Sequence, residues 1–339
     1  MSSDASPSAI DLPESANTKQ SRGKSLLIRI ITDRQKLLVL LIAALIMLMT
    51  ILEPNTFPRP ANAAVVLLDT AQTGILACGM MLLMISGMFD LSIGGIMAFS
   101  GIMAGLAAKQ LGLPPIGAFL VGCCWGVVLG TLNGVLVTKF RINALIATLA
   151  TLSIYRGGLQ LVSGSGVTNI GNGFTVFGQT KILGIYSPFW FMAAIVLLFI
   201  FLVGRTRFFR QAYYIGGNIR AAKLSGINVD RTVFSFFVIM GLLAGLTGAL
   251  LASRLNTAVV LAGQGVELKV ITAVVLGGAS LSGGVGTIFG AFLGVLLMAL
   301  LQNSMIIAGI SPFWQLIVVG IVLLLSVGLD QFARIGSRV

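Results

Sequence analysis

The sequence predicts an all-α polytopic membrane protein with about ten transmembrane helices. Of its 339 residues, 57% are hydrophobic and only 9% carry a charge, whereas charged residues make up about 25% of a soluble domain. The apolar residues are gathered in long runs, and a helix needs ~20 of them to cross ~30 Å of hydrocarbon. Both observations indicate a bundle of membrane-spanning helices.

The first half of the chain predicts six spans, each bounded by helix-breaking or polar residues. They cover about 37–52, 63–88, 96–108, 116–137, 144–161 and 188–203. Pro54 ends the first span, Asp90 separates the second from the third, and Gly112–Pro115 separates the third from the fourth. Arg141 follows the fourth span, and a Gly/Ser/Thr/Asn-rich segment, 163–187, follows the fifth.

The second half predicts four more spans, at about 232–252, 266–281, 287–307 and 312–329. The third and eighth spans are short or broken by glycine, so their boundaries are the least defined. The predicted transmembrane domain is therefore 37–330. A polar tail, 1–36, precedes it and a short tail, 331–339, follows it.

The stretch 205–231 between the sixth and seventh spans is strongly basic. It contains one anionic residue, Asp230, and these cations: Arg205, Arg207, Arg210, Arg220, Lys223 and Arg231. Short basic connections stay on the cytoplasmic side, and ten spans place both termini on that side as well. Asn218 is suited to cap a short helix that Gly226 would end. Two interpretations remain open, a docking site for a cytoplasmic partner or a solvated loop that only fixes topology.

Several function classes lack the residues that they need. The chain has no histidine, and it contains no nucleophile–base pair, metal-ligand spacing or phosphate-binding loop, which argues against a membrane-embedded enzyme and leaves any ATP chemistry to another polypeptide. Its cysteines, Cys78, Cys123 and Cys124, lie in apolar segments and are interpreted as buried small hydrophobes. The net charge of +12 is explained by cations that set the topology and contact anionic lipid headgroups, so it is poor evidence for nucleic-acid binding.

Glycine spacing and an internal repeat indicate how the helices pack. Glycines recur every four residues at Gly122, Gly126, Gly130 and Gly134, and again at Gly286, Gly290 and Gly294, which predicts close helix contacts. The sequence that starts at Asp90-Leu91 resembles the one that starts at Glu267-Leu268. Because the two copies enter the membrane from opposite sides, they predict an inverted-topology repeat.

Six polar residues within the apolar runs are candidates for a translocation pathway: Asp90, Asn133, Arg156, Glu267, Gln302 and Asn303. A carboxylate inside a span costs ~2.5–3.5 kcal/mol, so it usually faces a partner or a wet cavity. The structural alternative is that Asp90 caps the third helix and that Glu267 pairs with Lys269 or Arg254. The intramembrane amides suit hydrogen bonds to a neighbouring helix or to substrate hydroxyls.

Several segments resemble the permease subunit of bacterial ABC importers for sugars, the ribose, xylose, arabinose and autoinducer-2 group. The matching segments are FDLSIG (89–94), NALIATLATLSIYRG (143–157), IGGNIRAAKLSGINV (215–229), GVELKVITAVVLGGASLSGGVGTIFGAFLG (265–294) and Gln302-Asn303 through Trp314-Gln315. They extend over about 37–330 in the family's order.

The resemblance implies a multi-pass permease of the bacterial inner membrane whose two subunits form a homo- or heterodimer around a central pathway. A cytoplasmic ABC ATPase would bind ATP and magnesium, and an extracytoplasmic sugar-binding protein would dock on 163–187 and 253–265. Residues 216–227 would form the coupling helix. Its matching positions are Gly216, Gly217, Asn218, Arg220, Ala221, Ala222, Lys223, Ser225 and Gly226.

The remaining alternative is a secondary transporter driven by H⁺ or Na⁺. It would use Asp90 or Glu267 as its coupling site.

Overall fold

The computed structural model describes residues 34–171 and 173–336, with side chains described through Gly328. Of the predicted N-terminal tail, 1–36, only the last three residues are described, and they begin the first helix. The predicted C-terminal tail is helical as far as Gly336, and Arg338 lies outside the described residues.

Every predicted apolar segment coincides with a helix. These helices are α2 (Arg34–Leu52), α3 (Pro60–Ile85), α4 (Ile93–Lys109), α5 (Pro115–Thr138), α6 (Ala144–Ser163), α8 (Ser187–Arg205), α11 (Val229–Leu255), α12 (Val266–Leu276), α13 (Ile288–Ile307) and α14 (Pro312–Gly336). Seven of them, α2, α3, α5, α6, α8, α11 and α13, are long and apolar enough to cross a membrane. The chain therefore has the composition and helix lengths of a polytopic membrane protein.

Helix α12 is shorter than predicted. It has 11 residues and ends at Leu276, so it rises only ~16 Å, about half the thickness of the hydrocarbon. The prediction extended this segment to residue 281, but Gly277 and Gly278 follow Leu276, and Gly278 has a φ of +96°. That left-handed conformation is accessible to glycine and ends the helix.

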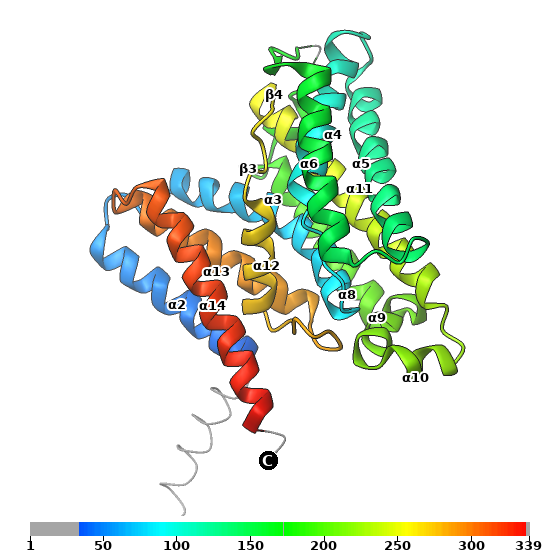
Figure 1. The fold of residues 1–339 in the computed structure, drawn as a ribbon. Coiled ribbons are helices and arrows are strands. Elements are labelled where there is room, and N and C mark those ends of the chain that lie inside the picture. Colours follow the sequence, from blue (N-terminus) through cyan, green and yellow to red (C-terminus); the bar gives the residue numbers. More distant parts are fainter. Residues whose placement is uncertain (1–33, 172, 337–339) are drawn as a thin grey trace, which may run out of the picture.

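Two long helices form the centre of the bundle (Figure 1). Helix α3 is buried over most of its length and packs against α8, α11, α12 and α13, while α11 packs mainly against α4 and α5. In Figure 1, α2, α13 and α14 lie on one side of α12, and α4, α5, α6 and α11 lie on the other. Many outward side chains of the outer helices are large and apolar, as expected of a lipid-facing surface.

The predicted glycine contacts are confirmed on α5. A Cβ atom added to Gly126 would lie 2.6 Å from the Cα of Gly245, and one added to Gly130 would lie 2.8 Å from the Cα of Gly241. Helices α5 and α11 therefore touch backbone to backbone, which requires residues without side chains. On α13, Gly290 and Gly294 pack against α12 in the same way, but Gly286 precedes the helix. The prediction that Gly286 belongs to this helical stripe is wrong.

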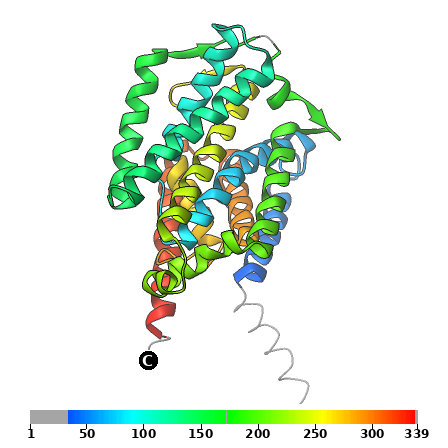
Figure 2. The same cartoon turned by 90° about the vertical axis from the view of Figure 1, so that its right-hand side faces the viewer.

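The two ends of the bundle carry different small elements. At one end β1 (Gly166–Thr168) pairs antiparallel with β4 (Thr257–Val259), beside α7 (Val176–Gln179) and the hairpin of β2 (Lys181–Ile182) and β3 (Ile185–Tyr186). At the other end lie α9 (Arg207–Gly217) and α10 (Ile219–Leu224), as Figures 1 and 2 show. Asp230 forms an ion pair of 2.8 Å with Arg141 at this second end.

Candidate functional site

Asp90 lies in a buried polar cluster that links three helices. Ser92 donates to Asp90 Oδ1 from its backbone nitrogen, at 2.8 Å, and from its hydroxyl, at 2.7 Å. Asn133 of α5 donates to the carboxylate at 3.3 Å and to the Ser92 hydroxyl at 2.7 Å. Tyr155 of α6 donates to Asn133 Oδ1 at 3.1 Å and to the carbonyl of Leu129 at 2.9 Å. The first three side chains are fully buried, and Tyr155 is 4% exposed.

This arrangement corrects the interpretation of Asp90 as a helix cap. Helix α4 begins at Ile93, and Ser92 occupies the N-cap position without a side-chain capping bond. The Asp90 carboxylate instead accepts hydrogen bonds from the turn before α4 and from α5. Buried polar groups are stable when they are fully hydrogen-bonded, so this cluster suits the joining of α4, α5 and α6.

Arg156 and Glu267 form a second pair of predicted site residues. Both are half-buried, and their opposite charges lie near each other, although no ion pair joins them among the described residues. The Arg156 guanidinium donates to the carbonyl of Val260 at 2.9 Å. Among the described residues, Glu267 Oε2 is buried without a hydrogen-bond partner. The proposed pairing of Glu267 with Lys269 is wrong, because Lys269 forms an ion pair with Asp69 of α3 at 2.7 Å.

Gln302 and Asn303 of α13 line a cavity of ≈ 230 Å³ between α13 and α3. Asn303 donates to Asn62 Oδ1 at 2.7 Å, while its own Oδ1 is buried and has no hydrogen-bond partner in the described part of the chain. Asp69 and Gln72 of α3 line the same cavity. The structure thus separates the six candidate residues into three places: Asp90 with Asn133, Arg156 with Glu267, and Gln302 with Asn303.

The basic stretch forms two short helices at one end of the bundle. As predicted, Asn218 caps a short helix, α10, by accepting from the backbone nitrogens of Arg220 and Ala221 at 3.0 and 3.1 Å. Gly226, with φ +82°, follows the end of this helix. Ala222 is buried and Gly216 is half-buried, whereas the other candidate coupling residues are exposed. Leu224, on the same helix, is 91% exposed.

Helix α9 joins this exposed helix to the bundle through backbone contacts. A Cβ atom at Gly216 would collide with the carbonyl oxygen of Ile85, the last residue of α3, and with the backbone nitrogen of Gly284. That nitrogen donates to the Ile85 carbonyl at 2.7 Å. The end of α9, the end of α3 and the loop before α13 therefore meet with no side chain between them.

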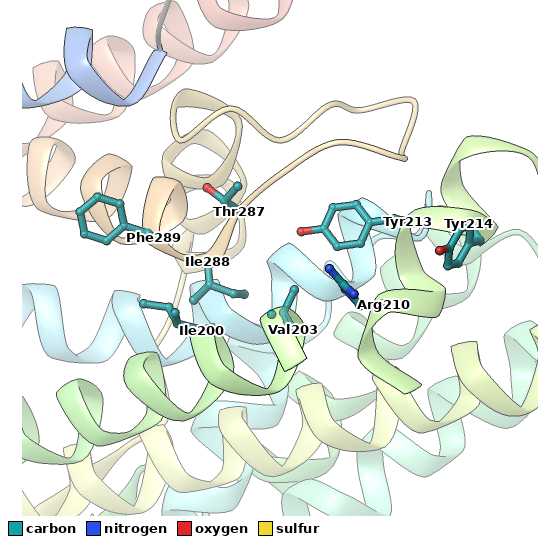
Figure 3. Close-up of a pocket in the computed structure, with 9 residues that line it drawn as sticks. Ile200, Val203, Arg210, Tyr213, Tyr214, Thr287, Ile288 and Phe289 are labelled. Carbon is teal, nitrogen blue, oxygen red and sulfur yellow. The ribbon is translucent and has the colours of Figure 1, made fainter. Parts of the chain in front are cut away.

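A cavity of ≈ 520 Å³ lies beside these contacts, between α8, α9 and the start of α13 (Figure 3). In Figure 3 the side chains of Arg210 and Tyr213 lie on the α9 side, and those of Thr287 and Phe289 lie across the cavity. The Tyr213 hydroxyl donates to the carbonyl of Gly286 at 2.8 Å. Burial raises the pKa of this phenol, against a weaker opposite effect of Arg210, so the hydroxyl keeps the proton that it donates.

Sequence reasoning missed helix α9, the side chain of Gln72 and the pairing of Lys269 with Asp69. The signal for α9 was present, since its apolar Ala212 and Ile215 are buried while its charged residues face outward. Asp69 and Lys269 are opposite charges on two different apolar segments, a pattern that favours an ion pair between helices.

The arrangement offers hydrogen-bonding groups and an exposed short helix, α10. Within residues 34–171 and 173–336, no group of three or more His, Cys, Asp or Glu side chains could hold a metal ion. The free amides and the Asp69 carboxylate can bind hydroxyl groups. What this geometry offers is hydrogen bonding to a polar molecule.

Comparisons with known proteins agree with this description. The chain matches the family described as "Branched-chain amino acid transport system / permease component" over residues 62–327. It is 42% identical to the ribose import permease protein RbsC of Bacillus subtilis (strain 168) over 292 residues, which cover 85% of this chain and 89% of the relative. No solved structure matches the chain.

Two further relatives cover most of the chain. The L-arabinose ABC transporter permease protein AraH of Azospirillum brasilense is 38% identical over 282 residues, 82% of each chain. The xylose transport system permease protein XylH of Haemophilus influenzae is 32% identical over 356 residues, 87% of this chain and 95% of the relative. The chain therefore belongs to the branched-chain amino acid transport system permease component family.

Proposed function

We propose that this chain is the transmembrane permease subunit of an ATP-driven importer that moves a monosaccharide-like solute. The proposal is supported by membership in a permease family and by relatives that are named for ribose, L-arabinose and xylose transport. The chain is a permease and not an enzyme. The family and the ABC transporter relative also favour this function over an ion-coupled transporter that uses Asp90 or Glu267.

The proposed topology has ten membrane segments in the bacterial inner membrane, with both termini in the cytoplasm and 37–330 as the permease domain. Seven helices of spanning length support it, and α4, α12 and α14 complete the count; of these three, α4 with 17 residues and α12 with 11 are short. Most cations outside the tails lie at the α9–α10 end, which the positive-inside rule assigns to the cytoplasm. The β1–β4 sheet would then face the exterior.

The proposed partners dock at these two ends. On the cytoplasmic side, 216–227 would be the coupling segment, seated on a separate ABC ATPase that binds ATP and magnesium. On the outer side, 163–187 and 253–265 would meet a sugar-binding protein. A second permease subunit, identical or related, would complete the pathway, and lipid would cover the outer apolar surface.

The exposure of Leu224 on helix α10 supports the coupling role most directly. Leu224 is 91% exposed on a capped helix, and burying one leucine contributes ~1.5–3 kcal/mol. The base of the same segment touches the ends of α3 and of the loop before α13 through bare backbone. A partner that binds α10 could therefore displace two transmembrane helices, α3 and α13, when it moves.

The pathway proposal assigns different roles to the six candidate residues. Gln302 and Asn303 face a cavity and are proposed to line the path. Arg156 and Glu267 remain candidates, because one Glu267 oxygen has no hydrogen-bond partner among the described residues. The hydrogen bonds of Asp90 and Asn133 are made within the protein, which supports a structural role for both.

The coupling role can be tested with two matched charge substitutions. We expect Leu224→Glu to lower co-purification of the ATPase roughly tenfold, because a charge would replace an apolar contact. Leu183→Glu is the control, since Leu183 is 87% exposed at the opposite end of the bundle. If Leu224→Glu co-purifies as much ATPase as Leu183→Glu and the wild-type protein do, the proposed coupling helix is contradicted.

A further inference from the structure

Two cavities adjoin at the outer end of α3. The larger has a volume of ≈ 720 Å³ and lies between the start of α3 and the segment that holds Gln179, Lys181 and Tyr186. The smaller, of ≈ 230 Å³, is lined by polar side chains of α3 and α13. Val65 and Arg254 line both cavities. The two spaces therefore share a wall that includes Arg254.

One residue that lines the smaller cavity has a side-chain oxygen without a hydrogen-bond partner among the described residues. Asn303 is 6% exposed, and its Oδ1 is buried with no hydrogen bond among the described residues. An unsatisfied buried acceptor is unfavourable, and native structures nearly always supply a partner. The Asn303 amide is held in place from its other end by the bond of 2.7 Å between its Nδ2 and Asn62 Oδ1.

The other polar groups of this cavity determine which ligand chemistry fits. Gln72 and Gln302 each offer a donor and an acceptor. Asp69 adds carboxylate oxygens, and its charge is balanced by Lys269 at 2.7 Å. A neutral solute with several hydroxyl groups matches this set, because each hydroxyl both donates and accepts.

We propose that the two cavities form one outward-facing passage and that Gln72, Gln302 and Asn303 bind a neutral polyhydroxylated solute at its inner end. Arg254 lies at the neck between the outer vestibule and this binding site. The inference rests on the proposed function, which places this end of the bundle outside the cell. It adds a specific site that includes Gln72, Asp69 and Arg254 to the general pathway.

Uptake kinetics of the complete importer test the solute site. For whichever of ribose, L-arabinose or xylose the wild-type complex takes up, we expect Gln302→Leu to raise KM about tenfold, because one solute hydroxyl loses its partner. The matched control is Gln160→Leu, which removes an exposed amide of α6 outside both cavities. ATPase co-purification, measured in parallel, reports folding and assembly.

The outcomes separate the site from the general function. An unchanged KM in a Gln302→Leu complex that still binds the ATPase overturns the site and leaves the importer function in place. A wild-type complex that binds no ATPase and takes up none of the three sugars overturns both.

Thiol labelling in intact cells tests the passage without a transported solute. Cys124 is exposed, so its predicted burial is wrong, and it is first replaced by serine to remove its thiol. In this Cys124→Ser background, we expect Gln72→Cys to react with a membrane-impermeant thiol reagent at least ten times faster than Leu76→Cys. Leu76 lies one turn further along α3 and is fully buried. Equal labelling of the two positions, or labelling only from the cytoplasmic side of inverted vesicles, overturns the outward-facing passage.

Discussion

Two polar clusters lie within the apolar bundle, and they differ in whether the protein satisfies their hydrogen bonds. The closed cluster consists of Asp90, Ser92, Asn133 and Tyr155, which are bonded to one another. The open cluster consists of Asp69, Gln72, Arg254, Gln302 and Asn303, which line a cavity. Both contain a carboxylate and an amide. Residue type alone therefore does not distinguish a cluster that is bonded to itself from one that faces a cavity, whereas the hydrogen bonds and the adjacent space do.

The largest expected effect is a loss of stability when the closed cluster loses its central amide. Asn133→Leu removes the donor to Asp90 and Ser92 and the acceptor for Tyr155, leaving a buried carboxylate short of partners. We expect the free energy of unfolding to fall by about 3 kcal/mol. Denaturant unfolding in detergent measures it, and a loss below about 1 kcal/mol would mean that the cluster is not a structural unit.

A smaller loss of stability is expected from Tyr155→Phe. The substitution removes the hydroxyl that donates to Leu129 and Asn133 but keeps the buried ring. The free energy of unfolding should fall by about 1 kcal/mol. The same unfolding measurement checks this value, and a loss as large as that of Asn133→Leu would contradict the central position of Asn133.

The smallest effect on stability is expected from Gln302→Leu in the open cluster. The Gln302 side chain makes no hydrogen bond to the described residues, so the substitution breaks none of those contacts. The free energy of unfolding should stay within about 0.5 kcal/mol of wild type. A loss comparable to that of Asn133→Leu would make the two clusters equivalent and would remove the distinction between them.

The helices could be predicted because apolar runs of spanning length are a strong local signal. The errors have local causes as well. The predicted eighth span continued past Gly277 and Gly278, although these residues end α12. The sequence does not predict helix α9, because arginines interrupt the apolar pattern to which Ala212 and Ile215 belong.

The sites were harder to predict because their residues meet through packing between distant segments. Asp90 and Asn133 are 43 positions apart, and Asp69 and Lys269 are 200 apart. The sequence identified Asp90, Asn133, Gln302 and Asn303 as unusual residues for a span. It did not indicate which pairs come together, nor that Gln72 shares a cavity with Gln302.

Helix α3 also connects the proposed coupling segment, 216–227, with the proposed solute site. Its last residue, Ile85, touches Gly216 and Gly284, and Asp69 and Gln72 lie on the same unbroken helix, with Asp69 ~24 Å away from Ile85 at ~1.5 Å per residue. If α3 moves as one unit, a tilt imposed at Ile85 reaches the polar cavity through the helix itself. Movement of the nucleotide-binding partner would then be transmitted to the solute by displacement of a single helix, and no chain of side-chain contacts would be needed.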